Sequence, residues 1–255
     1  MQSERETRLE ALLAHARALV GVTLADLADG MGLPVPVGAV RTKGWPGQII
    51  ERELGAGEAS RARAKRGNPA VPVRSAGRGQ DFAALGVELK TVPVDPDLTP
   101  RESTAVCQID PVSISGESWE TSYVRHKLAR VLWVALVVPP DTRDVGDRRV
   151  EAVRLWSPAP AEELVLRTDF ELFVRGFFRL GRAAEITGHH GVALQVRPKG
   201  RNAADLRSAY GPDGLPVRIG KSGFYLRPSF VGPILRGLSY DGREWSSPPP
   251  ELSLP

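Results

Sequence analysis

The chain has 255 residues, a length that suits one domain, or one domain with two lobes, and allows a sizeable core. Its net charge of +4 and pI of about 9.4 favour an anionic partner only mildly. The single cysteine, Cys107, excludes an internal disulfide and a cysteine-rich zinc site, and it suits a small core residue in a strand. The charged N-terminus lacks a signal core, and the longest apolar run, residues 131–140, is too short to span a bilayer. We therefore expect a cytoplasmic protein without a membrane partner.

Two helices are predicted at the start of the chain. Apolar residues recur at three- and four-residue steps from Leu9 to Leu19, which is typical of an amphipathic helix. Thr23 and Asp26 resemble a capping box, and Gly30 is a suitable stop for the short helix that follows them.

The next segment combines loops with basic residues. Residues 43–47, with the sequence KGWPG, predict a loop, and residues 48–54 begin or continue a helix. Residues 55–80 hold six Arg or Lys residues against one acid and show little periodicity. We interpret this stretch as a mobile basic loop, which is either a solvated insertion without function or a DNA contact.

The rest of the chain mixes strands with helices. The predicted elements are a tight hairpin over residues 81–92, a short helix over 123–128, a strand over 131–138, a long helix with an apolar stripe over 166–177, strands over 193–196 and 224–226, and a short helix near 202–210. This order predicts a mixed α/β fold, in which a mixed β-sheet is flanked by helices.

Three charged residues in the predicted hairpin suggest metal-dependent hydrolysis. Glu88 and Lys90 are two apart in a strand and project to the same face, and Asp81 precedes the bend and can return to that face. Two carboxylates can share a magnesium ion, while the ammonium orients a water or stabilises charge on a phosphodiester. The spacing alone is weak evidence, because acid and lysine pairs are common on solvated strand faces.

A series of short motifs carries a stronger signal. In chain order they are KGW at 43–45, Glu51, DFAALGVELKT at 81–91, WETS at 119–122, VRHKL at 124–128, RVLW at 130–133, LWSP at 155–158, RPK at 197–199 and GFYL at 223–226. Together they resemble the MutH mismatch-repair endonuclease family, over nearly the whole chain as far as about Phe230. The block DFAALGVELK is highly specific.

The resemblance implies both a fold and an activity. The implied fold is restriction-endonuclease-like, with two lobes around a DNA-binding cleft over residues 1–235 and a flexible tail over 236–255. The implied activity is Mg²⁺-dependent nicking of the unmethylated strand of hemimethylated GATC sites in double-stranded DNA, on the 5′ side of the guanine. The implied partners are MutL, which activates the enzyme, and MutS, which acts indirectly; we expect a monomer.

The resemblance also assigns roles to individual residues. The implied catalytic set is Asp81, Glu88, Lys90, Glu51 and Lys127. Asp81 and Glu88 match metal ligands, helped by the backbone carbonyl of Leu89, and Glu51 completes the metal and water site. The implied DNA-binding residues are Lys43, Arg197, Pro198, Lys199 and Tyr225. In this set the loop at 197–199 reads base edges and Tyr225 senses adenine methylation.

Several alternatives stay open. The chain could be a type II restriction endonuclease of the same family that cuts GATC, or a DNA-binding module without activity, although its intact catalytic set argues against the latter. Tyr225 could be a core aromatic residue, and Arg197 and Lys199 could contact phosphates only. Ala105 stands where a phenylalanine is expected, so a DNA contact made by that ring is in doubt.

Overall fold

The computed structural model describes residues 2–37, 44–56, 79–141, 144–200, 202 and 204–238. It divides into two compact units. Unit 1 comprises Met1–Arg101, Ala129–Ser157 and Leu235–Gly237, and unit 2 comprises Glu102–Leu128, Pro158–Ile234 and Leu238–Pro255. Lys43, most of the predicted basic loop and most of the predicted tail lie outside the described residues, and the division into a domain over 1–235 and a tail stays a prediction.

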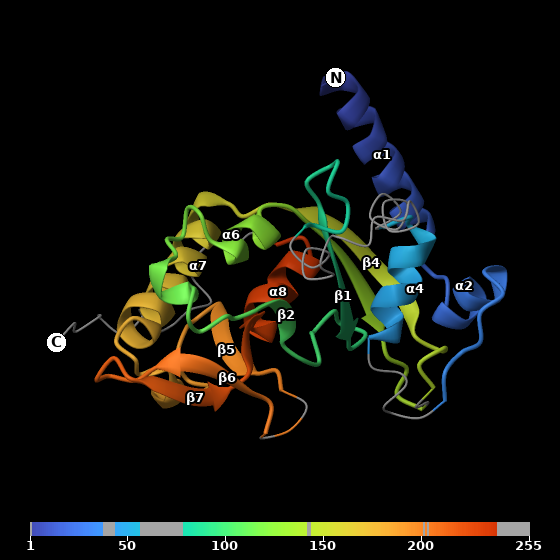
Figure 1. Cartoon of the computed structure of the whole chain (residues 1–255). Helices are drawn as coiled ribbons and strands as arrows, with labels where there is room; N and C mark the ends of the chain where they lie inside the picture. The colour runs from blue at the N-terminus through green and yellow to red at the C-terminus, as the bar shows by residue number, and fades with distance from the viewer. Residues whose placement is uncertain are drawn as a thin grey trace, which may run out of the picture. The chain divides into compact units, whose positions relative to one another are not determined.

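Unit 1 is a mixed three-stranded sheet with helices (Figure 1). Its elements are α1 (Gln2–Ala18), α2 (Leu24–Gly30), α4 (Trp45–Glu53), β1 (Glu88–Val94), β3 (Val131–Val137) and β4 (Arg149–Trp156). The strand order is β1-β3-β4, with β1 parallel to β3 and β4 antiparallel to it. The predicted helix from Leu9, the predicted strand from Val131 and the mixed α/β class are confirmed.

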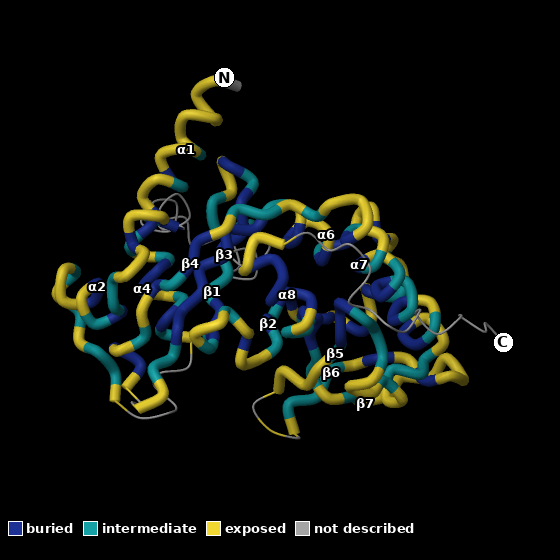
Figure 2. The backbone as a smooth tube through the Cα atoms, turned by 180° about the vertical axis from the view of Figure 1, so that it is seen from behind, coloured by how far each residue is buried: buried dark blue, intermediate teal, exposed yellow. Residues whose placement is uncertain are grey.

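The core of unit 1 lies between the sheet and its helices. Leu89, Leu132 and Val134 share one face of the sheet and belong to the same buried cluster as Leu12 of α1 and Ile50 of α4. The strands are largely buried, whereas most of α1 is exposed (Figure 2). The alternation of strand side chains therefore places Glu88 and Lys90 on the face opposite this cluster.

Local signals set the ends of two helices. The capping box of α2 is confirmed: the Asp26 N–H donates to Thr23 Oγ1 at 3.1 Å, and the Thr23 N–H donates to the Asp26 carboxylate at 3.3 Å. The predicted loop over 43–47 is wrong in its described C-terminal part, because α4 begins at Trp45. Pro46 is tolerated there, since the first turn of a helix leaves its N–H groups without intrahelical partners.

The predicted hairpin over 81–92 is reduced to a bridged turn. Phe82 and Val87 form an isolated antiparallel bridge, with hydrogen bonds of 2.9 and 3.3 Å between their backbone groups. Beyond Val87 the chain enters β1 and pairs with β3 instead of folding back on itself. A hairpin of full length is therefore wrong, because the buried sheet supplies the hydrogen bonds of β1.

Unit 2 contains a small antiparallel sheet, a two-stranded ribbon and a long helix (Figure 1). Its strands are β2 (Thr104–Gln108), β5 (Leu194–Pro198), β6 (Leu206–Tyr210), β7 (Pro216–Gly220) and β8 (Ser222–Leu226). Its α-helices are α6 (Tyr123–Leu128), α7 (Pro160–Phe173) and α8 (Pro228–Leu235). Helix α7 continues as a π-helical segment, η3 (Val174–Phe178). Two short 3₁₀ turns are η2 (Ile114–Gly116) and η4 (Ala183–Glu185). The sheet order is β2-β8-β5, and β6 pairs with β7.

The short helix predicted near 202–210 is wrong. This segment forms β6, which pairs with β7 in antiparallel register from Leu206 opposite Gly220 to Tyr210 opposite Pro216. The segment Gly211–Leu215 between the two strands has the sequence GPDGL, whose Gly, Pro and Asp residues favour a tight turn. Pairing with β7 through this turn therefore outweighs the short helical pattern of the segment.

A buried carboxylate fixes the chain before β5. Asp169 of α7 is 2% exposed and accepts hydrogen bonds of 2.6–2.9 Å from three consecutive backbone N–H groups, those of Val192, Ala193 and Leu194. Arg227 donates to backbone carbonyls of the same segment, including that of Gly191 at 3.0 Å. Burial raises the pKa of the Asp169 carboxyl, and the three N–H donations partly offset this shift.

Removing this carboxylate should destabilise unit 2. Asp169→Ala leaves three N–H groups without their acceptor, so we expect unfolding by urea to require about 3 kcal/mol less free energy. Asp169→Asn keeps one acceptor oxygen and should lose less. Equal stability of the wild-type and alanine proteins would contradict this stabilising role of Asp169.

No helix in the described parts of the chain is both long and apolar enough to cross a membrane.

Candidate active site

The first residues of β1 carry the predicted acid and lysine. Glu88 is 2% exposed, and its Oε1 lies 2.6 Å from Lys90 Nζ. The Lys90 side chain keeps 17% of its surface exposed, so the pair lies at the margin of the interior. A buried carboxylate requires such a partner, because desolvation of an unpaired charge costs several kcal/mol.

Asp81 reaches the same strand from before the turn. Its Oδ2 accepts a hydrogen bond of 2.8 Å from the backbone N–H of Leu89. The side chain of Leu89 points into the core and is 5% exposed, while its backbone lies between Glu88 and Lys90. The bridged turn between Phe82 and Val87 therefore places the Asp81 carboxylate beside the acid and lysine of β1.

Glu51 is brought to β1 by α4. A Cβ atom added to Gly47 would lie 3.4 Å from Thr91 Oγ1 of β1 and 3.9 Å from Glu51 Oε1. Gly47 thus lets α4 approach β1 closely on the face that carries Leu89 and Thr91, which is opposite the face of Glu88 and Lys90. All the acids predicted for catalysis, and Lys90, belong to unit 1.

The donor atoms at β1 suit a hard divalent cation. Two carboxylates, from Asp81 and Glu88, and the backbone carbonyl of Leu89 offer oxygen ligands, and Mg²⁺ prefers oxygen and needs only one or two carboxylates because it keeps several waters. Within the described ranges, no group of three or more His, Cys, Asp or Glu side chains is placed to hold a metal. The described structure therefore does not gather the Asp81, Glu88 and Glu51 carboxylates into one three-acid metal site, and the metal assignment stays a prediction.

Apart from Lys43, which is not described, the residues predicted to bind DNA belong to unit 2. On β5 and β8, Arg197 pairs in register with Gly223, and Gln195 pairs with Tyr225. Lys199 Nζ lies 5.8 Å from the centre of the Tyr225 ring. Arg197, Lys199 and the intervening Pro198 are exposed. Arg197 and Lys199 thus carry positive charge at the surface of unit 2, and the Lys199 ammonium lies beside an aromatic ring.

Gly223 makes this arrangement possible. A Cβ atom there would lie 2.7 Å from the Cys107 carbonyl oxygen, 3.1 Å from Lys199 Cδ and 3.4 Å from the Tyr225 ring. A side chain at this position would therefore displace both the strand and the lysine.

The environment of Tyr225 raises the pKa of its phenol. Burial raises the pKa of Tyr225, and the nearby Arg197 guanidinium lowers it by a smaller amount. The side chain is only partly buried, so Tyr225 is not a fully enclosed core aromatic. Ala105 lies directly opposite Tyr225 in the β2–β8 register, so the departure noted in the sequence is next to this ring.

The remaining predicted residue, Lys127, belongs to unit 2. It lies on α6, is 8% exposed, and its Nζ is 5.6 Å from the centre of the Tyr123 ring. A buried ammonium over an aromatic face is stabilised by the ring quadrupole.

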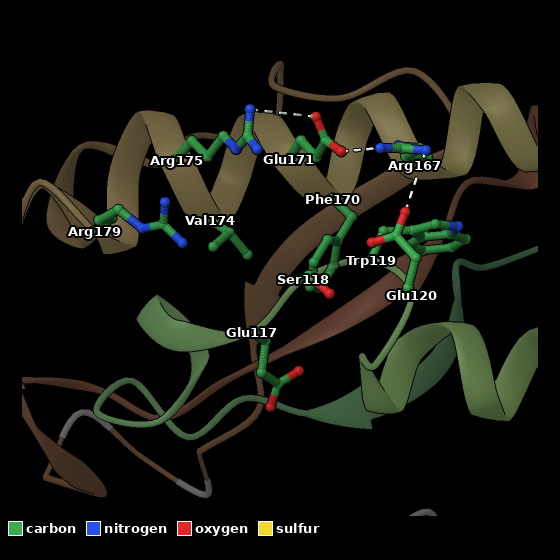
Figure 3. Close-up of a pocket in the computed structure, with 10 residues that line it drawn as sticks. All are labelled: Glu117, Ser118, Trp119, Glu120, Arg167, Phe170, Glu171, Val174, Arg175 and Arg179. Carbon is green, nitrogen blue, oxygen red and sulfur yellow. Dashed lines mark hydrogen bonds and ion pairs between the residues drawn. The ribbon is translucent and has the colours of Figure 1, made fainter.

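A surface pocket of unit 2 contains none of the predicted site residues (Figure 3). It is lined by Glu117, Ser118, Trp119, Glu120, Arg167, Phe170, Glu171, Val174, Arg175 and Arg179. Arg167 pairs with Glu120 at 3.2 Å and with Glu171 at 2.8 Å. The three arginines that line the pocket are balanced by three glutamates, so the pocket has no net charge that would attract an anion.

Two residues beside Arg197 were missed by the sequence reasoning. Gln195 and Ser103 hydrogen-bond to each other, and Ser103 also binds Arg197. The available signal was a polar amide between the apolar residues Leu194 and Val196 of a predicted strand. Ser103 carried no comparable signal.

Comparisons with known proteins identify the family of this chain. A family model described as DNA mismatch repair enzyme MutH matches residues 74–169. The DNA mismatch repair protein MutH of Pectobacterium atrosepticum is 41% identical over 89% of this chain and 90% of its own length. The MutH proteins of Shewanella amazonensis and Vibrio cholerae are 41% and 38% identical, covering 89% and 90% of this chain and 94% and 96% of their own lengths. The chain therefore belongs to the MutH family of DNA mismatch repair enzymes.

Proposed function

We propose that this chain is a Mg²⁺-dependent endonuclease that nicks the unmethylated strand of hemimethylated GATC sites during mismatch repair. The observation that carries the proposal is the group at the start of β1. There Asp81 binds the Leu89 backbone and Glu88 pairs with Lys90, in a chain of the MutH family. Acids and an ammonium at one strand end are what phosphodiester hydrolysis requires.

Each residue of this group has a distinct task. Asp81, Glu88 and the Leu89 carbonyl would hold Mg²⁺, which when bound polarises the phosphate and lowers the pKa of water. Lys90 is held beside Glu88 and stabilises the negative charge that develops on the scissile phosphate. Glu51, which lies on α4, would complete the metal and water site, as membership of the family implies.

Recognition rests on β5 and β8. Arg197 and Lys199 present N–H donors that suit guanine O6 and N7 in the major groove. The Tyr225 ring lies beside the Lys199 ammonium and excludes a methyl group from adenine N6 by steric conflict. In this function the chain acts as a cytoplasmic monomer on double-stranded DNA, MutL activates it, and MutS acts indirectly by finding the mismatch.

A strand-resolved nicking assay tests the proposal. With Mg²⁺, we expect cutting of only the unmethylated strand of a hemimethylated GATC duplex, slow cutting without MutL, and none after chelation of the metal. A duplex with a scrambled site serves as the control.

Three outcomes would count against this function. Cleavage of both strands in one event would favour the restriction endonuclease alternative. Binding of the duplex without cleavage would favour a binding module. Cleavage that survives chelation would remove the metal from the mechanism.

A further inference from the structure

Two hydrogen bonds converge on the Ser103 hydroxyl, immediately before β2. Gln195 Nε2 donates to Ser103 Oγ at 2.7 Å, and Arg197 Nη1 donates to the same oxygen at 3.0 Å. Gln195 and Arg197 are two apart on β5, so both side chains project to one face of the sheet. A single hydroxyl oxygen therefore connects a buried amide to an exposed guanidinium.

These contacts cross the strand that carries Tyr225. The strand order is β2-β8-β5, so β8 lies between β2, which Ser103 immediately precedes, and the two donors on β5. Gln195 is in register with Tyr225, and Tyr225 is in register with Ala105. Residues directly opposite each other in a sheet share a face. The Arg197 guanidinium is therefore held on the face that carries Tyr225.

The anchor is more rigid than the residue it holds. Gln195 is 5% exposed, so its amide has little rotational freedom, and it fixes the position of the Ser103 oxygen. Arg197 is exposed and, without a partner, would sample many rotamers. The bond to Ser103 uses one of the five N–H donors of the guanidinium, which leaves others for a two-pronged contact with guanine.

We propose that Ser103, itself held by Gln195, is a positioning residue that orients Arg197 for base reading. This inference rests on the proposed function, because it assumes that Arg197 reads a base edge. Ser103 has no part in bond cleavage; it fixes the guanidinium before DNA arrives. The cost of ordering that side chain is then met in the free protein and not during binding.

The test compares sequence preference in matched variants. The measured quantity is the ratio of kcat/KM for a hemimethylated GATC duplex to that for a duplex with one G·C pair of the site changed. Ser103→Ala should reduce this ratio by about tenfold, the effect expected from freeing one long side chain. Ser103→Thr keeps the hydroxyl and should restore it. Ser208→Ala removes a comparable contact, the 3.4 Å bond from Arg218 Nη1 in the β6–β7 ribbon, and should leave the ratio unchanged.

A double-mutant cycle separates positioning from general weakening. If Ser103 acts only through Arg197, adding Ser103→Ala to Arg197→Ala should change the ratio no further. Should Ser103→Ala fail to fold, as judged by urea unfolding, Gln195→Met removes the amide that holds Ser103 and should shift the ratio in the same direction.

The possible failures can be distinguished. If the wild-type protein shows no preference for GATC, the proposed function fails and the inference fails with it. If Arg197→Ala abolishes the preference but Ser103→Ala keeps it, only the inference is overturned. An equal loss on every duplex for Ser103→Ala would also overturn it, because that pattern reports phosphate contact or stability and not base reading.

Discussion

Replacing Glu88 by glutamine should abolish DNA cleavage while DNA binding persists. The substitution keeps the size of a side chain that is 2% exposed, but it removes an oxygen that we propose as a Mg²⁺ ligand and the charge that holds Lys90 Nζ at 2.6 Å. Both losses act on the transition state, so we expect the nicking rate to fall on the order of 10³-fold or more. The affinity for the duplex should change far less, since the residues of β5 and β8 that we propose to read DNA are untouched.

The matched control for this variant is Glu53→Gln. Glu53 lies at the end of α4 in the same unit and pairs with His15 at 3.0 Å, so the control removes the same charge from an ordinary surface pair. Nicking of a supercoiled plasmid gives the rate, and gel retardation without added metal gives the affinity. Full activity of Glu88→Gln would refute the metal assignment.

Replacing Tyr225 by alanine should allow cleavage of fully methylated GATC sites. In the proposed function the ring excludes a methyl group from adenine N6, and one methyl group changes discrimination by up to about 100-fold. The alanine variant should reduce the preference for hemimethylated over fully methylated DNA to a few-fold. Tyr225→Phe keeps the ring and should keep the preference, because the exclusion is steric and does not require the phenol.

Two control measurements are needed to interpret this result. Arg197 lies beside Tyr225, so cleavage of an unmethylated duplex must be followed in parallel to show that general recognition is intact. Equal cutting of both methylation states by the wild-type protein would show that Tyr225 does not sense methylation. If the alanine variant still discriminated between the methylation states, another residue would have to sense the methyl group.

Elements with strong local signals were predictable from the sequence. The capping box at Thr23 and Asp26 and the buried strand from Val131 are confirmed, because both depend on contacts between near neighbours or on a continuous apolar run. The mixed α/β class is confirmed as well, and the family to which the chain belongs has a restriction-endonuclease-like fold. These predictions needed no knowledge of distant pairing.

Elements that depend on distant partners were not predictable. The segment at 202–210 showed a short helical pattern, but its pairing with β7 converts it to β6. The hairpin over 81–92 was shortened because β1 pairs in parallel with β3, which comes after the whole of β2 and α6 in the chain. A parallel partner of this kind leaves no local sequence signal.

The candidate site also contains contacts that the sequence predicts and contacts that it does not. Glu88 and Lys90 could be placed on one strand face from their spacing, and the DFAALGVELK block linked them to Asp81. The support of Arg197 by Ser103 could not be predicted, because the order of β2, β8 and β5 brings these residues together from far apart in the chain. Supporting contacts of this kind are properties of the folded sheet and not of a motif.

The interleaving of the two units has a consequence for how the chain is made. Unit 1 takes β3 and β4 from residues that follow the first segment of unit 2, and β2 of unit 2 pairs with β8 near the end of the described chain. During synthesis neither sheet can complete its strand pairs until late segments of the chain have been made. Until then the first strands have unpaired edges. A single cut of the gene cannot release either unit whole, so fragments carrying only the first segment of unit 1 or only β5 and β8 should fail to fold.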